Sequence, residues 1–174
     1  MLALSAPSSA AAPMPIRPAP SWPPQLAAAS FRRRGAQINW TNSSAVELLR
    51  DRRNDREAMA TAAAILEEIV AMKPQSYNLR GNLAAALSGA GRASEAVQNL
   101  LESERLASER GVVIDTLFHL RAAQIFRRAG MTDQAAARLD VAEADLRAGS
   151  AEPATRGPLL EQVAEERRLL TGGQ

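Results

Sequence analysis

Two segments of this chain carry the same order of small and large residues, and this repetition limits the fold more than any other feature. In the first segment, Leu87 is followed by Gly91 after four residues and by an alanine after five more. In the second, Phe126 is followed by Gly130 and an alanine at the same two steps. The equivalent positions of the two copies are, in order, Leu83, Ala84, Leu87, Gly91, Ala96 and Leu100, and Ala122, Ala123, Phe126, Gly130, Ala135 and Leu139. Apolar residues at helical spacing on both sides of a glycine predict two helices joined by a tight turn.

The pattern resembles the tetratricopeptide repeat (TPR), a helix–turn–helix unit of about 34 residues. In such a unit, Ala84 and Ala123 stand where the two helices approach closely, and a larger side chain would push the helices apart. Leu87 and Phe126 then fill the adjoining space. The resemblance implies a scaffold that binds a protein or peptide rather than a catalyst.

A partial third copy lies upstream of the other two. Counting back 34 residues places Val46 and Leu49 on a first helix, Leu66 on a second helix and Pro74 at the end of the unit. This copy departs from the pattern at three positions, Arg50, Arg53 and Glu57. We therefore expect a divergent end cap, as terminal repeats commonly are. The two complete copies are 39 residues apart, so we expect longer helices around residues 107–115.

Helical spacing continues through most of the chain after residue 40. Proline is absent from residues 41–73 and 75–152, where apolar residues recur at intervals of three and four. We expect a first helix capped within Thr41–Ser44, followed by helices at Arg56–Met72, Ser76–Gly89, Ser94–Glu109, Asp115 or Thr116 to Ala129, Thr132–Gly149 and Pro158–Leu170. The sequence thus predicts an all-α fold, a helical-hairpin repeat solenoid of about three TPR-like units in residues 41–150. A C-terminal capping helix and tail occupy residues 151–174.

The first forty residues differ in composition from the rest. They hold four arginines, no acidic residue and seven of the ten prolines. Such a segment buries too little apolar surface to offset its ordering entropy, so we expect a disordered leader. Its alanines, serines and Phe31–Arg34 cluster are typical of an organellar transit peptide, and its prolines favour the plastid type. We therefore expect a protein of the plastid stroma; the alternatives are a mitochondrial protein, or a bacterial cytoplasmic protein with a disordered leader.

The charge balance argues against nucleic acid as a partner. The chain has 21 basic and 19 acidic residues, and four of the basic residues lie in the leader, so the remainder carries a net charge of −2. Electrostatic binding of nucleic acid needs a basic domain. We also expect no transmembrane segment, because no apolar run approaches the length of a membrane span.

Side chains for catalysis or metal binding are scarce. The chain has no cysteine and a single histidine, His119, at a position that the repeat usually gives to a large packing residue. Without a second histidine or a thiolate, a zinc site cannot be assembled from the usual ligands. Gly89 and Gly91 lack the third glycine of a phosphate-binding loop. We therefore expect neither an enzyme nor a cofactor, a bound metal or a small-molecule ligand.

One candidate binding surface remains. In the TPR family the first helix of each unit lines a concave groove, and in the last unit this helix carries four polar residues, Arg121, Gln124, Arg127 and Arg128. Basic residues in a groove can hold a carboxylate through charge-assisted hydrogen bonds. In the first unit the corresponding helix carries Glu47 and Asp51. The alternative is that these residues form an ordinary solvated helix face.

The carboxylate clamp of chaperone-binding TPR proteins is not matched. Gly81 and Ala85 stand where that clamp needs lysine and asparagine. We therefore expect a protein-binding scaffold, an adaptor or an assembly factor for a protein complex, whose partner is not a chaperone tail. A structural subunit buried in a larger, organellar assembly is the alternative.

Overall fold

The structure is a computed structural model, and it describes residues 42–51, 55–149 and 151–172. All of them belong to one compact unit, which runs from Gly35 to Gln174. The predicted leader and transit peptide in residues 1–40 and the repeat departure at Arg53 lie outside the described residues. The domain boundaries and the plastid location therefore stay predictions.

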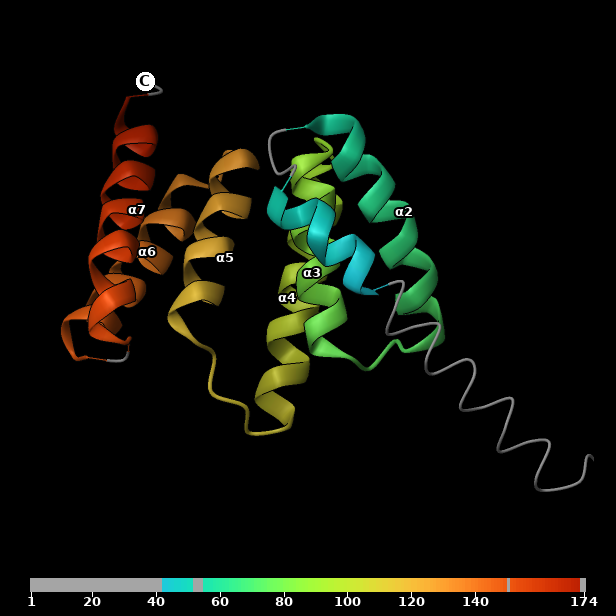
Figure 1. Cartoon of the computed structure of the whole chain (residues 1–174), viewed down its shortest axis with the longest axis horizontal. Helices are drawn as coiled ribbons and strands as arrows, with labels where there is room; N and C mark the ends of the chain where they lie inside the picture. The colour runs from blue at the N-terminus through green and yellow to red at the C-terminus, as the bar shows by residue number, and fades with distance from the viewer. Residues whose placement is uncertain (1–41, 52–54, 150, 173–174) are drawn as a thin grey trace, which may run out of the picture. The chain divides into compact units, whose positions relative to one another are not determined.

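Every regular element of the described residues is an α-helix, which confirms the all-α prediction (Figure 1). Residues 42–51 are helical, so Ser44 lies inside this helix, whereas the candidate cap Thr41 lies outside the described residues. The elements that follow are α2 (Arg56–Met72), α3 (Tyr77–Gly89), α4 (Ala93–Glu109), α5 (Thr116–Arg128), α6 (Thr132–Arg147) and α7 (Pro153–Thr171). Helix α7 begins at Pro153 instead of at Pro158, which lies inside the helix. A proline is tolerated in the first turn of a helix because the N–H groups there have no intrahelical acceptor.

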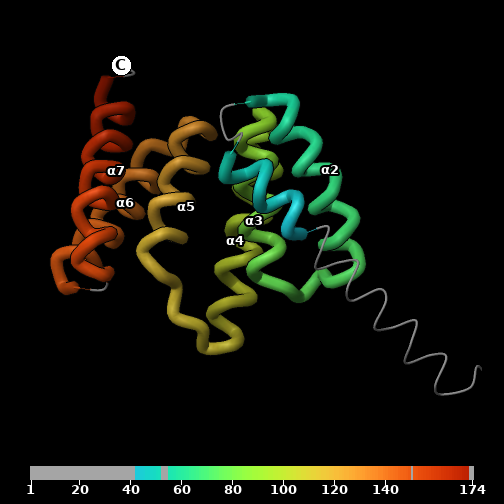
Figure 2. Tube along the Cα trace, in the orientation of Figure 1, coloured from blue at the N-terminus to red at the C-terminus, as the bar shows by residue number. Residues whose placement is uncertain are grey.

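Consecutive helices run in opposite directions and lie side by side (Figures 1 and 2). Helices α3 and α4 form one hairpin, and α5 and α6 form the next. Helix α3 also packs against α2, and α7 packs mainly against α6 with a smaller contact to α5. The described chain is thus a solenoid of helical hairpins, with α7 covering its last pair.

The two sequence copies end their first helices with the same backbone hydrogen bonds. Arg92 donates its N–H to the carbonyl of Leu87, and Met131 donates to that of Phe126, both at 2.9 Å. Gly91 and Gly130 lie between donor and acceptor with φ values of 85° and 74°. Only glycine adopts this left-handed conformation at little cost, and it ends the helix and reverses the chain. The predicted glycine turns are therefore present in both copies.

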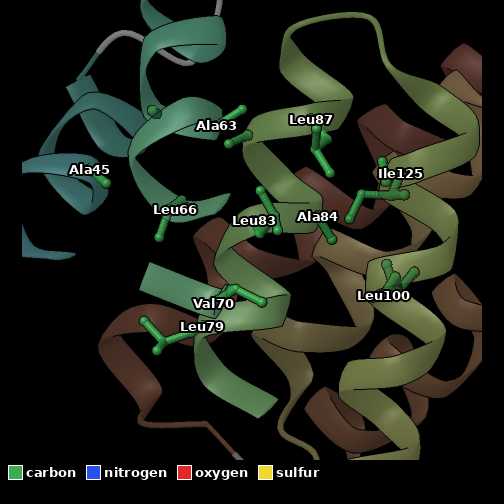
Figure 3. Packing of buried hydrophobic residues seen from close by; sticks show 14 of the residues in the cluster. Ala45, Ala63, Leu66, Val70, Leu79, Leu83, Ala84, Leu87, Leu100 and Ile125 are labelled. Atoms are coloured by element: carbon green, nitrogen blue, oxygen red, sulfur yellow. The ribbon is translucent and has the colours of Figure 1, made fainter. Parts of the chain in front are cut away.

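The small residues of the pattern lie in the core. Ala84 and Ala123, together with their partners Ala96 and Ala135 on the second helices, are almost fully buried. In Figure 3, Ala84 lies on the side of α3 that faces Leu100 and Ile125. Because an alanine side chain is short, the two helices of each hairpin can approach closely there. The spacing of small residues thus positions the first helices, which carry the candidate site.

Candidate functional site

A groove of about 380 Å³ lies along the first helices of the hairpins. Residues 42–51, α3, α5 and α7 contribute to its walls, and α2 adds one methionine. Its lining residues are Val46, Leu49, Arg50, Met59, Asn82, Ala85, Ser88, Leu117, Leu120, Arg121, Gln124, Ile125, Arg128 and Gln162. Among these there are three arginines and no carboxylate. The groove therefore combines an apolar floor with positive charge.

Three of the four predicted site residues line this groove, namely Arg121, Gln124 and Arg128. Arg127 is turned away from it and donates from Nε to Oε2 of Glu166 at 2.8 Å. Neighbouring residues on an α-helix point about 100° apart, so Arg127 and Arg128 cannot share one face.

Glu166 of α7 is bound at both carboxylate oxygens. Gln124 donates from Nε2 to its Oε1 at 3.0 Å, while Arg127 binds the other oxygen. Glu166 is only 8 % exposed. A buried carboxylate is stable only when it is paired and hydrogen-bonded. This contact therefore fixes α7 against α5 and holds Gln162 of α7 in the groove wall.

Arg121 is a groove arginine with weak pairing inside the described part of the chain. There, the hydrogen bond it forms is to Oδ1 of Asn82, at 3.5 Å, which is at the limit of a real bond. Among the described residues, no carboxylate forms an ion pair with it. Loss of solvation lowers the pKa of Arg121, while the more distant Asp115 carboxylate acts in the opposite direction. The groove walls thus replace part of the water around this guanidinium but leave the side chain accessible to a ligand.

Arg50 is a groove residue that sequence reasoning missed. In the sequence Arg50 is a departure from the repeat pattern, because it replaces a small residue. In the structure it lines the groove, and its Nε bonds the adjacent Asp51 at 2.8 Å on an exposed surface. The acidic residues expected on this helix, Glu47 and Asp51, are exposed and are not among the lining residues. The sequence signal for this was the arginine at a position where the other two copies have alanine.

Ser88 adds a polar group to the groove from the last turn of α3. The residue is 6 % exposed, and its hydroxyl has no hydrogen-bond partner within the described part of the chain. A buried hydroxyl without a partner costs free energy. A ligand that supplied a donor or acceptor at this position would remove that cost.

His119 of α5 is not among the groove residues and lies half-buried next to Arg138 of α6. Its Nδ1 is 3.5 Å from Nη1 of Arg138, and burial, followed by the charge of Arg138, lowers the pKa of His119. Arg138 in turn binds Glu104 of α4 at 2.7 Å, so this cluster joins the two hairpins. His119 therefore has the surroundings of a packing residue at the contact between the two hairpins.

A second depression, of about 460 Å³, lies between α4 and α6 on the opposite helices of the two hairpins. Its lining is almost entirely apolar: Leu101, Phe126, Met131, Gln134, Ala137, Arg138 and Val141. Leu101 and Val141 at its edge are 49 % and 42 % exposed. Two large apolar side chains on the second helices are thus open to solvent.

Comparison with known proteins does not assign this chain to a family. No protein-family model, no curated protein and no solved structure matches this chain. Across the ranges that the structure describes, none of the helices has the length and apolar character needed to span a bilayer. In the same ranges, no three metal-ligating side chains converge on a point.

Proposed function

We propose that this chain is a protein-binding scaffold that acts as an adaptor or assembly factor for a protein complex. The observation that carries the proposal is the groove along the first helices, which draws its lining from several hairpins and joins an apolar floor to three arginines. Interfaces between proteins commonly combine an apolar core with a polar rim, and arginine is enriched in them.

The four predicted site residues have different roles in this proposal. Arg121 and Arg128 contact the partner directly, because both line the groove. Gln124 contributes to the groove and to the contact with α7. Arg127 acts through Glu166, by holding α7 in place as the groove wall.

Filling the groove tests the proposal. Ala85 is a half-buried lining residue on α3, so a tryptophan at this position would occupy the space of a ligand. We expect the tagged Ala85→Trp protein to lose partners that the wild-type protein recovers from extracts of its native cells. Ala144→Trp is the matched control, because Ala144 is exposed on α6 and lines neither depression. Equal recovery by both variants would contradict a groove-binding function.

A second candidate function is a structural subunit buried in a larger assembly. The specific observation in its favour is the apolar depression between α4 and α6, with Leu101 and Val141 exposed at its edge. Exposed apolar patches commonly mark surfaces that other proteins cover. In this case the second helices, rather than the groove, would be the main contact surface.

A further inference from the structure

Acidic residues are distributed unevenly between the helices of the hairpins. Helices α3 and α5 contain no aspartate or glutamate, although they carry Arg80, Arg121, Arg127 and Arg128. Helices α2, α4 and α6 together hold eleven acidic and four basic residues. Helices α3 and α5 themselves therefore bring arginines but no carboxylate to the centre of the groove, and one of these arginines, Arg127, pairs with Glu166 of α7.

We infer that the groove binds a short acidic peptide segment whose one end carries apolar side chains. This inference rests on the proposed function, because it names the kind of partner segment that the groove accepts. The partner is an extended stretch of another protein, with carboxylates near the arginines and an apolar end over the floor.

The environment of Arg121 is the reason to expect carboxylates in the bound peptide. This guanidinium has lost part of its solvation, and among the described residues it forms one long hydrogen bond, to Asn82. A guanidinium presents a planar fork that binds a carboxylate through two parallel hydrogen bonds. A ligand carboxylate would therefore add an ion pair to Arg121, for which the described residues provide only the long bond to Asn82 and the electrostatic effect of Asp115.

The apolar end of the ligand follows from the order of residues along α5. Leu117 lies in the first turn and is 54 % exposed, while Arg128 is the last residue of the helix. Leu117 and Arg128 are eleven positions apart on the helix, which is roughly 16 Å along its axis at about 1.5 Å per residue. An extended peptide covers this distance with about five residues. The segment thus places apolar side chains near Leu117 and acidic side chains towards Arg128.

A long polyanion such as RNA fits this charge distribution poorly. The excess of acidic residues on α2, α4 and α6 repels a chain that extends beyond the groove. A short acidic segment reduces this repulsion because it lies mainly along α3 and α5, which contain no carboxylate.

A random-peptide phage library selected on the immobilised full-length protein tests the inference. We expect enriched peptides to combine aspartate or glutamate with large apolar residues. Replacing Arg121→Gln together with Arg128→Gln should weaken a selected peptide at least tenfold, since two charge-assisted contacts to its carboxylates are lost. The matched control, Arg110→Gln with Arg168→Gln, removes the same charge from exposed positions outside the groove and should leave binding unchanged.

The outcomes separate this inference from the proposed function. Enriched peptides without acidic residues, with binding lost in Ala85→Trp, would overturn the inference and leave the groove function standing. Equal loss in both arginine double variants would also overturn it, because the effect would then be one of net charge. Displacement of the peptide by a short oligouridylate at similar concentration would indicate a general polyanion site and overturn it as well. Failure to enrich any peptide whose binding depends on Ala85 would overturn the inference and contradict the proposed function too.

Discussion

At the scale of single residues, side-chain size decides how closely the helices pack. Ala84 and Ala123 are almost fully buried, whereas the next alanine on α3, Ala85, is only half buried and faces the groove. Adjacent alanines on one helix therefore have different functions. One permits the close contact of two helices, and the other leaves space that a ligand can use.

Larger side chains at the buried alanines should destabilise the fold. We expect Ala84→Leu and Ala123→Leu each to lower the free energy of unfolding by about 1–3 kcal/mol, because overpacking forces the neighbouring side chains and backbone to move. Ala85→Leu is the control and should cost well below 1 kcal/mol, since its side chain extends into the groove. Urea denaturation followed by circular dichroism measures these differences. Parent-like midpoints for both buried variants would show that the helix contacts lie elsewhere.

At the scale of elements, α7 is held by polar contacts as well as by its apolar residues, among them the ion pairs of Arg167 with Asp140 and Glu143 of α6. It buries Val163 in the second core cluster, next to Leu139 and Leu146 of α6. Its contact with α5 centres on Glu166, which receives hydrogen bonds from Gln124 and Arg127. Because α7 contributes to the groove wall, the stability of this helix is linked to the shape of the candidate site.

Neutralising Glu166 should loosen α7. In Glu166→Gln, an amide replaces one of the two acceptor oxygens, which leaves a partly buried donor without a partner and costs about 1–3 kcal/mol. Hydrogen–deuterium exchange should then become faster in α7 while the amides of α3 keep their protection. The neighbouring variant Glu165→Gln provides the control, because Glu165 forms only an exposed pair with Arg168 and such pairs contribute about 0–1 kcal/mol. Equal exchange in the two variants would argue against a role of Glu166 in holding α7.

At the scale of the whole molecule, the two depressions lead to different expectations for the isolated protein. The groove favours an adaptor, which should be soluble and monomeric on its own. The apolar depression with Leu101 and Val141 favours a subunit that needs its neighbours. The solution state of the full chain therefore distinguishes the two candidate functions.

We expect the purified full-length protein to be a monomer in size-exclusion chromatography with light scattering. In that case Leu101→Gln combined with Val141→Thr should leave its elution unchanged, because isolated exposed apolar side chains are tolerated on protein surfaces. If the wild-type protein instead self-associates and the double variant is monomeric, the depression is a contact surface and the buried-subunit function is favoured. Circular dichroism of both proteins controls for the integrity of the helices.

The limits of the sequence prediction can be seen at particular residues. The helical spacing predicted α2 with the same ends that the structure shows, since the run of apolar positions is bounded by charged residues and by Pro74. The predicted cap at Ser94 was wrong, because Arg92 occupies the cap position of α4. Likewise Met131, not Thr132, precedes α6. After each glycine turn the chain enters the second helix at once, so the turn, rather than a capping side chain, sets where the helix begins.

The sequence by itself determined the helices, the glycine turns and the small residues at the helix contacts, because these follow from local backbone preference and from side-chain volume. It also placed Arg121, Gln124 and Arg128 on one helix, and these residues line the groove. Only the tertiary structure decided that Arg127 binds Glu166, 39 residues away, and that Arg50 belongs to the same groove as Arg121. Such pairings depend on how helices distant in sequence rotate and pack against each other. No local pattern carries this information, because the packing of many buried side chains sets it at once.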